Sequence, residues 1–486
     1  MTITDLKPAI VWKYFHQVTQ VPRPSKKEEK IIAYLESFAK EHGISYIKDE
    51  AGNLLMSKAA TAGYENREKV IFQSHMDMVC EKNNGTEHDF DHDPIRTIVE
   101  GDWLRADGTT LGADNGIGVA AQLALLASDD IEHGPLELLF TVDEETGLTG
   151  AKSVKPGFLT GNILINLDSE DEGEIFIGCT GGKDTKAVFT YTPQATDPSK
   201  FYVKIDVKGL NGGHSGGDIH KGLGNANKIL ARFLYQLDKQ FAWTLCSFNG
   251  GNLRNAIARE AIAVIGIDKK DKEDVRILLN HFSADMEREL HYVDPNIQIV
   301  METVDRPEVA ICDVCKVNLV RALVAAPHGV IEMSHAIEGL VETSTNLASV
   351  KMDADNTIVI GTSQRGSIES SKNAVVNQVA ATFILAGASV SHGDGYPGWE
   401  PNPSSAILKV AKEAYVKLYK KEPEVKAIHA GLECGLFLEK YPQLDMISFG
   451  PTMRDVHSPS ERLLIPTVQL WWDHLLELLK HIPVKK

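Results

Sequence analysis

The sequence is poor in cysteine. It has six cysteines in 486 residues, and only Cys312 and Cys315 have a suggestive spacing. Because no second such pair accompanies them, a structural zinc ribbon is not indicated, and we expect both thiols on one turn of a helix. Reduced thiols are typical of the cytoplasm, so a cytoplasmic protein is expected.

Long apolar runs and an excess of basic residues are also missing. No apolar run approaches the ~18 residues of a transmembrane helix. The first twenty residues lack the basic start, apolar core and small-residue cleavage site of a secretory signal. The formal net charge is −17, whereas nucleic acids and anionic membranes require a basic surface. We therefore expect no nucleic-acid partner and no membrane association.

The remaining composition is that of an ordinary globular protein, with 43% hydrophobic and 24% charged residues. At about 150 residues per domain, a chain of 486 residues is expected to form two or three domains. The composition itself names no substrate, so the indication of function has to come from local motifs.

The most informative motif is FQSHMDMVC, which begins at Phe72, the last residue of an apolar run at 70–72. His75 and Asp77 are two residues apart, and alternate side chains of a strand point to one face. An imidazole would thus emerge beside a carboxylate that can fix its tautomer, as in many metal sites. Taken alone, the motif is also compatible with a polar loop after a strand.

A second motif, LGADNGIGVAAQLALLA, places Asp114 among glycines at the start of an apolar helix. A simple helix N-cap is one interpretation. The functional alternative is a carboxylate presented from a tight turn, where Gly112 and Gly116 let the backbone approach a site closely.

A third motif, LELLFTVDEETG, ends a buried strand in Asp143, Glu144 and Glu145. Side chains of successive extended residues diverge, so adjacent glutamates could serve a metal and a water at one site. A solvated strand end is the alternative. A further apolar strand at 163–167 ends at Asp168.

Three apolar strands, 70–72, 138–142 and 163–167, therefore end in acidic or histidine residues, and a helix separates the first two. Apolar strands alternating with helices predict an α/β fold with a mostly parallel sheet and helices on both faces. Ligands bind such sheets at the carboxyl ends of the strands, where these side chains lie.

The pattern of elements changes near residue 186 and returns near residue 396. Between them, two similar series of strands and helices follow each other, which predicts an inserted α+β lid domain made of two similar halves. The expected domains are a catalytic domain in two parts, 1–185 and 396–486, and the lid at 186–395.

The predicted lid carries chemistry-bearing residues outside regular elements. His214 lies in the glycine-rich GGHSGG, Asn255 lies beside a strand, and Arg365 follows another strand. In the last part of the chain, His429 lies in HAGLECG and His457 follows a turn at Gly450-Pro451.

The ordered motifs resemble the two-zinc peptidases related to aminoacylase, carboxypeptidase G and carnosinase, along nearly the whole chain. Within that family, Gly213-His214-Ser215 and the doubled lid are most similar to the bacterial aminoacyl-histidine dipeptidases. Five separated motifs in the family's order are a specific signal, which none of them is alone.

The resemblance implies two metal sites. Asp114 would bridge both ions, with His75 and Asp168 completing one site. Glu145 and His457 would complete the other site. Two divalent ions ~3.5–4 Å apart can share a hydroxide and polarise a carbonyl. Mixed histidine and carboxylate ligands suit Zn²⁺, and also Co²⁺ or Mn²⁺.

The resemblance also implies roles beside the metals. Asp77 would orient His75, and Glu144 would be the general base that activates water and carries a proton to the leaving amine. The lid residues that would grip the transition-state oxyanion and the substrate carboxylate are His214, Asn255 and Arg365. His429 falls where relatives carry a glycine-rich substrate loop.

The function expected from the resemblance is metal-dependent hydrolysis of dipeptides with a free C-terminal carboxylate, including Xaa-His and β-alanyl-histidine. An aminoacylase or tripeptidase on the same scaffold is the nearest alternative. A non-catalytic, metal-stabilised binding protein is an alternative of another class. The small peptide substrate is the expected partner, and a homodimer through the lid is compatible with the resemblance.

Overall fold

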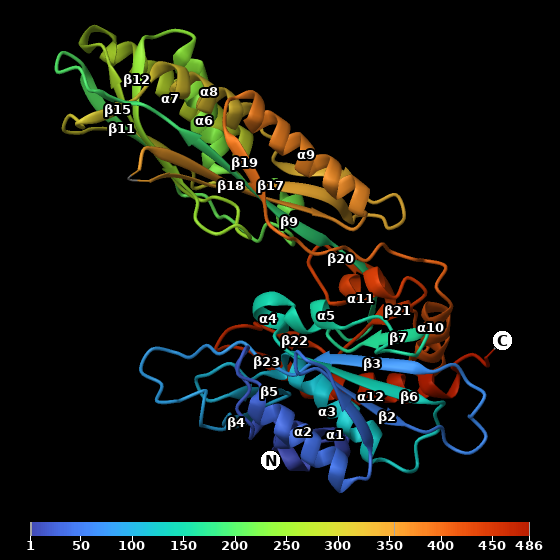
Figure 1. The fold of residues 1–486 in the computed structure, drawn as a ribbon. Coiled ribbons are helices and arrows are strands. Elements are labelled where there is room, and N and C mark those ends of the chain that lie inside the picture. Colours follow the sequence, from blue (N-terminus) through green and yellow to red (C-terminus); the bar gives the residue numbers. More distant parts are fainter. Residues whose placement is uncertain (1, 354, 486) are drawn as a thin grey trace. The chain divides into compact units, whose positions relative to one another are not determined.

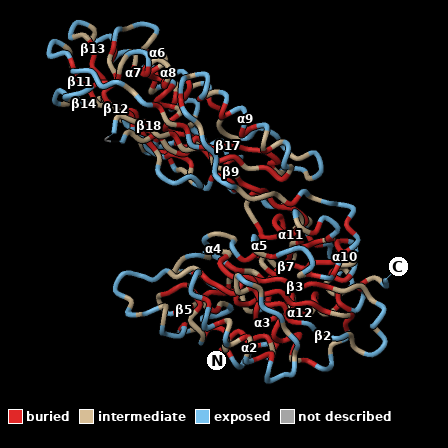
Figure 2. The backbone as a smooth tube through the Cα atoms, in the orientation of Figure 1, coloured by how far each residue is buried: buried red, intermediate tan, exposed pale blue. Residues whose placement is uncertain are grey.

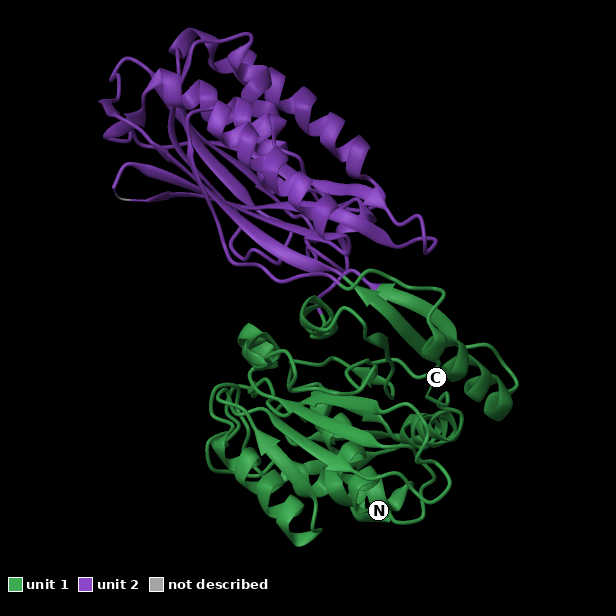
Figure 3. Ribbon diagram, turned by 45° about the vertical axis from the view of Figure 1, so that its right-hand side comes forward, with its two compact units in different colours: residues 1–179, 399–427, 432–486 green, residues 180–398, 428–431 purple. Residues whose placement is uncertain are grey.

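The computed structural model describes residues 2–353 and 355–485, and the chain divides into two units (Figure 3). The first unit, drawn in green, comprises residues 1–179, 399–427 and 432–486. The second, drawn in purple, comprises residues 180–398 and 428–431. The second unit is thus inserted into the sequence of the first.

These bounds differ from the expected 186–395 by a few residues at each end and by one added segment, 428–431. The amide of Thr180 accounts for this segment, because it donates to the carbonyls of Ile428 (3.2 Å) and Ala430 (3.0 Å). The local sequence does not predict a backbone pairing between segments so far apart in the chain.

The described residues of the first unit form two sheets, which combine elements from both ends of the chain (Figure 1). Its helices are η1 (Ile3–Asp5), α1 (Ala9–Thr19), α2 (Glu29–Glu41), α3 (Ala113–Ala127), α4 (Glu144–Gly147), α5 (Thr149–Ser153), α10 (Ala406–Tyr419), α11 (Cys434–Lys440) and α12 (Ile465–Lys480). Its strands are β1 (Ser45–Lys48), β2 (Leu54–Lys58), β3 (Val70–His75), β4 (Thr97–Glu100), β5 (Trp103–Ala106), β6 (Leu136–Thr141), β7 (Ile163–Asn166), β8 (Glu174–Cys179), β20 (Glu424–Ile428), β21 (Asp445–Ser448), β22 (Met453–Arg454) and β23 (Arg462–Leu464).

The main sheet of the first unit has the strand order β1-β2-β6-β3-β7-β21-β8-β20. Its centre, β6-β3-β7-β21, is parallel, and β1, β2 and β8 pair antiparallel with their neighbours. Every residue of β3, β6 and β7 is buried, as Figure 2 shows in red. Parallel strands covered on both faces carry apolar residues on both faces, which is why these strands lack a regular alternation of apolar and polar residues.

Helices cover both faces of this sheet. α1, α2 and α3 lie on one side of it, and α5 and α11 lie on the other (Figure 1). The fold class expected for the catalytic part is therefore confirmed.

The register of the parallel strands aligns their ends. His75 of β3 lies opposite Thr141 of β6, and Gln73 lies opposite Asn166 of β7. The carboxyl ends of the three strands consequently meet at one edge. A smaller sheet has the order β22-β23-β5-β4.

The second unit combines long strands with four main helices (Figure 1). Its helices are η2 (Ile219–Lys221), α6 (Ala226–Asp238), η3 (Lys269–Asp271), α7 (Lys272–Leu290), α8 (Asp313–Ala325) and α9 (Glu369–Leu385). Its strands are β9 (Gly181–Thr190), β10 (Pro193–Ala195), β11 (Phe201–Lys208), β12 (Trp243–Gly250), β13 (Ala261–Ile267), β14 (Gln298–Thr303), β15 (Val309–Ile311), β16 (Gly329–Met333), β17 (Val341–Asp353), β18 (Thr357–Gly366) and β19 (Ser389–His392).

Its large sheet has the order β14-β11-β13-β12-β17-β18-β9-β19, with β16 beside β17. The sheet has two similar halves, which meet between β12 and β17. From this junction outward, the first half has the hairpin β12-β13, then β11, then the edge strand β14, and the second half has the hairpin β17-β18, then β9, then the edge strand β19. The central strand of the second half is β9, which precedes the first half in sequence. The tandem series of elements expected within 186–395 did not include this strand, because its partners β18 and β19 lie over 160 residues away.

The helices α6, α7, α8 and α9 pack on one face of that sheet (Figure 1). They share one apolar core with it, which includes Phe233, Phe282, Leu319 and Phe383. The second unit therefore has its own core. Across the described residues of both units, no helix combines the length and apolar character needed to cross a membrane.

Candidate metal centre

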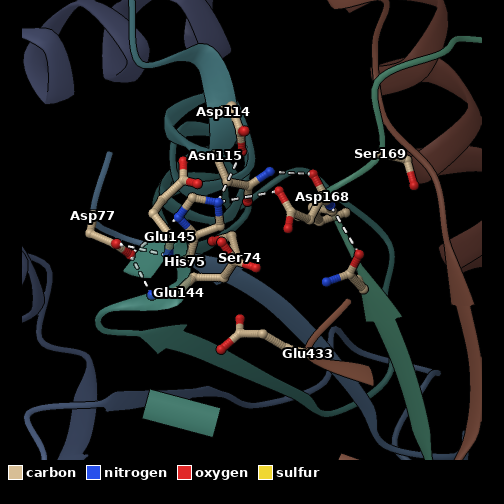
Figure 4. Close-up of polar contacts among 12 residues, drawn as sticks. Ser74, His75, Asp77, Asp114, Asn115, Glu144, Glu145, Asp168, Ser169 and Glu433 are labelled. Carbon is tan, nitrogen blue, oxygen red and sulfur yellow. Dashed lines mark hydrogen bonds and ion pairs between the residues drawn. The ribbon is translucent and has the colours of Figure 1, made fainter. Parts of the chain in front are cut away.

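The predicted ligands of the first unit come together where the parallel strands end. Figure 4 shows His75, Asp114, Glu145 and Asp168 pointing toward one another. His75 is the last residue of β3, and Asp168 lies two residues beyond β7. The register of the parallel strands places both side chains at the same edge.

His75 is buried and makes one group of contacts. Its Nε2 atom lies 2.9 Å from Asp114 Oδ1 and 3.4 Å from Asp168 Oδ1. Its Nδ1 atom lies 3.3 Å from Asp77 Oδ1. Burial raises the pKa of Asp168 to about 6, with the Asp114 charge acting in the same direction.

His457 makes a second group of contacts on the other side of the same carboxylate. Its Nε2 atom lies 3.0 Å from Asp114 Oδ2 and 3.0 Å from Glu145 Oε2. Asp114 therefore faces one histidine with each of its oxygens. The structure brings together all five predicted ligands, as two histidine–carboxylate groups that share Asp114.

The spacing and chemistry of these atoms fit divalent metal ions. Atoms that bind one zinc tetrahedrally at about 2.0–2.1 Å lie roughly 3.3 Å apart, close to the separations above. His75, Asp114 and Glu145 form a group whose ligand atoms all lie within 4.8 Å of one another. The buried Oε1 atom of Glu145 has no hydrogen-bond partner, so a ligand position is available there.

The electrostatics of the group also favour bound cations. Hydrogen bonds to Asp114 and Glu145 raise the pKa of His457 to about 11. Burial lowers the pKa of His75, but Asp168 and Asp114 outweigh this and raise it well above its usual value. The carboxylates thus favour positive charge at both imidazoles, and a bound metal ion would supply that charge in place of a proton.

Asp77 holds the segments that carry His75, Glu144 and Glu145 together by hydrogen bonds and a close contact. It is fully buried, and besides His75 it accepts hydrogen bonds from Ser25 Oγ (2.7 Å) and from the amides of Glu144 (3.1 Å) and Glu145 (3.3 Å). One carboxylate therefore connects the first histidine to the backbone of both glutamates. Burial raises the pKa of Asp77, but its hydrogen bond to His75 contributes to a net lowering.

The expectation that Glu144 and Glu145 are extended is wrong. They begin the short helix α4, whose N-cap, Asp143, has φ +50°. Their side chains diverge because successive helical residues are rotated by about 100°. The hydrogen bonds from their backbone amides to Asp77 hold this turn in place. Burial, more than any other cause, raises the pKa of Glu144 well above its usual value.

The other predicted residues belong to the second unit. His214 Nδ1 accepts hydrogen bonds from the amides of Gly216 (3.2 Å) and Gly217 (3.0 Å). In the neutral ring the proton must then be on Nε2, which is a donor. Desolvation and the charge of Arg365 lower the pKa of His214, favouring that neutral form. Asn255 lies beside it, since its carbonyl accepts from the amide of Ser215 (2.8 Å).

The positive charge of Arg365 acts on two neutral imidazoles, those of His214 and His429. Arg365 Nη1 donates to Tyr396 Oη (3.2 Å), while its buried Nε has no hydrogen-bond partner. His429 Nε2 lies 2.7 Å from Ser344 Oγ. Burial and the charge of Arg365 lower the pKa of His429 to about 3, so this ring is neutral.

The buried charged residues near the predicted ligands that the sequence analysis missed include Arg23, Glu433 and Glu461. Glu433 accepts hydrogen bonds from Gln73 Nε2 (2.6 Å) and Thr141 Oγ1 (2.7 Å), and burial raises its pKa to about 8. It belongs to the same HAGLECG motif as His429, which could have drawn attention to it. For Arg23 and Glu461, no local pattern distinguishes these residues from surface ones.

Comparison with known proteins places this geometry in context. Residues 71–480 match peptidase family M20/M25/M40. The chain is 44% identical over 484 residues to a cytosol non-specific dipeptidase of Escherichia coli (strain K12), covering 99% of each chain.

Among solved structures, the aminoacylhistidine dipeptidase from Vibrio alginolyticus is similar over 100% of this chain and 99% of its own. The TM-score is 0.94 and the identity is 42%. The aminopeptidase PepT from Bacillus cereus, at 17% identity, covers 98% of this chain and 99% of its own with a TM-score of 0.59, which is a likeness of fold alone.

Proposed function

Because the chain belongs to peptidase family M20/M25/M40, we propose that it is a metal-dependent dipeptidase. The family resemblance inferred from the ordered motifs is confirmed. The proposed substrates are dipeptides with a free C-terminal carboxylate, including Xaa-His and β-alanyl-histidine. The names of the E. coli and V. alginolyticus relatives support this substrate class, and the E. coli name supports a cytoplasmic location.

The observation that carries the proposal is the shared Asp114 between two histidine–carboxylate groups. We assign His75 and Asp168 to one ion and Glu145 and His457 to the other, with Asp114 serving both. Zn²⁺ suits this donor set, and Co²⁺ or Mn²⁺ are alternatives. Bound there, the ions would polarise the peptide carbonyl and lower the pKa of water.

Glu144 is the proposed general base and acid. Its raised pKa suits a group that takes a proton from water and returns it to the leaving amine near neutral pH. Asp77 positions it, since it holds the Glu144 amide while it also faces His75. The metal ligand and the proton carrier are therefore supported by the same buried carboxylate.

The second unit supplies the proposed substrate contacts. The Nε2–H of His214 is a suitable donor to a developing oxyanion. The unpartnered Nε of Arg365 is a suitable donor to the substrate carboxylate, which a guanidinium binds with two parallel hydrogen bonds. Asn255 and His429 are assigned to substrate binding with them, because they lie close to His214 and Arg365.

A hydrolysis panel tests this function. Chelated protein should be inactive, and Zn²⁺, Co²⁺ or Mn²⁺ should restore hydrolysis of dipeptides, with far less action on tripeptides and N-acyl amino acids. Elemental analysis verifies metal removal. Full activity in metal-free protein would contradict the proposal, and a preference for tripeptides or acyl-amino acids would replace the substrate class while leaving the metal centre intact.

A further inference from the structure

Arg23 holds the turn that carries Asp114 from one side. Its side chain is only 2% exposed. Its Nη1 donates to the carbonyls of Met76 (3.1 Å) and Asp77 (2.6 Å), just beyond His75. Its Nη2 donates to the carbonyl of Gly112, two residues before Asp114. One guanidinium thus connects the segment after β3 to the segment before α3.

Glu461 holds the same turn from the other side. It is also 2% exposed. Its Oε2 accepts from the amides of Leu111 (2.7 Å) and Gly112 (2.9 Å), and its Oε1 accepts from those of Ala113 (2.8 Å) and Asp114 (3.4 Å). Two of these amides, those of Ala113 and Asp114, belong to the first turn of α3, where amides lack intrahelical partners. Glu461 lies four residues after His457, so it also connects the His457 segment to this turn.

The backbone turn before Asp114 is tightly packed between the side chains of Arg23 and Glu461. Gly112 has φ +68°, and a Cβ atom there would lie 2.5 Å from Arg23 Nη2. A Cβ atom at Gly116 would lie 2.6 Å from the same nitrogen. The two glycines singled out in the sequence therefore make room for the buried guanidinium.

We propose that Arg23 and Glu461 are positioning residues that set Asp114 between His75 and His457, and that metal affinity depends on them. The inference rests on the proposed metal centre. Asp114 presents one oxygen to each histidine, so the orientation of its carboxylate decides whether it can serve both proposed ions. Arg23 connects its turn to the His75 segment, and Glu461 connects it to the His457 segment. The partners that orient metal ligands typically change metal affinity by 10- to 100-fold when removed.

The test measures metal binding rather than hydrolysis. Glu461→Gln keeps the size of the side chain but places an amide NH₂ against backbone N–H groups. Arg23→Lys keeps the charge but cannot reach both segments. Competition with a chromophoric chelator should show Zn²⁺ affinity lowered by about 10- to 100-fold in each variant. Because both side chains bind Gly112, the losses in the double variant should be less than additive.

Glu137→Gln is the matched control. Glu137 is 3% exposed and also accepts backbone amides, from Thr160 (2.9 Å) and Gly161 (3.2 Å). It lies at the start of β6, at the opposite end of the strand from the metal edge. This variant should lower the melting temperature and leave the Zn²⁺ affinity unchanged.

The outcomes separate the inference from the proposed function. If the wild-type protein binds two ions and both variants bind them equally well, the positioning role is wrong while the function stands. If both variants fail to fold while Glu137→Gln folds, the pair serves stability alone and the inference is again wrong. Wild-type protein that binds no metal would overturn the proposed function itself.

Discussion

Glu144 and Glu145 show how much a single position matters at this site. Glu145 lies 3.0 Å from His457 Nε2, and its other oxygen is buried without a partner. Glu144 is the residue whose pKa burial raises. Adjacent residues of one type thus have different environments, because the side chains of successive helical residues point about 100° apart.

Glu144→Gln should therefore keep both metal ions and lose activity. Removing a general base costs roughly 10²–10⁴-fold in rate, whereas an amide of the same size leaves the neighbouring ligands in place. Glu145→Gln should instead lower the metal content. Elemental analysis beside kcat distinguishes the two. Loss of metal in Glu144→Gln with full retention in Glu145→Gln would reverse the assigned roles.

Arg365 tests the recognition of the substrate terminus. Arg365→Ala should lower kcat/KM for dipeptides by about 10- to 100-fold, the cost of a lost hydrogen bond to a charged group. C-terminally amidated dipeptides should be affected much less. Arg276→Ala, which removes an exposed arginine that pairs with Glu273, is the control. Equal losses on free and amidated substrates would exclude Arg365 from carboxylate binding.

At the scale of elements, the contact between α10 and α12 contains a buried histidine. His474 is 3% exposed, and its Nε2 lies 2.8 Å from the carbonyl of Ala411. Its ring also contacts Tyr415 and Phe449. Burial lowers its pKa to about 4 from the ordinary 6.5. Folding at this contact therefore requires a neutral imidazole.

This shift predicts acid sensitivity. Between pH 6.5 and about 4, the unfolded chain binds a proton at His474 that the folded chain does not, so the free energy of unfolding falls as the pH falls. The wild-type protein should lose up to about 3 kcal/mol more than His474→Gln over this range. Denaturant unfolding at pH 7, 6, 5 and 4 measures the difference. Parallel curves would contradict it, and the exposed His92→Gln should behave like the wild type.

At the scale of the whole molecule, the predicted ligands all belong to the first unit, and the second unit has a core of its own. A ligand that binds only the folded state stabilises it by about 2.7 kcal/mol at 100 times its Kd. Zn²⁺ should therefore slow hydrogen exchange in the first unit by roughly 100-fold, most clearly at Leu111–Asp114, and leave the second unit unchanged. Equal protection of both units would contradict this, and Asp114→Ala should abolish the effect.

The sequence by itself determined much of this protein. Uninterrupted apolar runs identified β3, β6 and β7 as buried strands, and side-chain chemistry at their ends identified His75, Asp168 and the two glutamates as a group. Both kinds of information are local, since burial on two faces and ligand chemistry depend on residue type. The same information supported the family, which the match over residues 71–480 confirms.

Only the tertiary structure decided how that group is held. Arg23 is 89 residues from Gly112, and Glu461 is 350 residues from Leu111. β9 likewise has its partners far along the chain. In sequence, a buried charge looks like a surface charge, because its burial depends on partners that folding brings from elsewhere. The chemistry of the site was therefore local information, whereas its support arose from long-range packing.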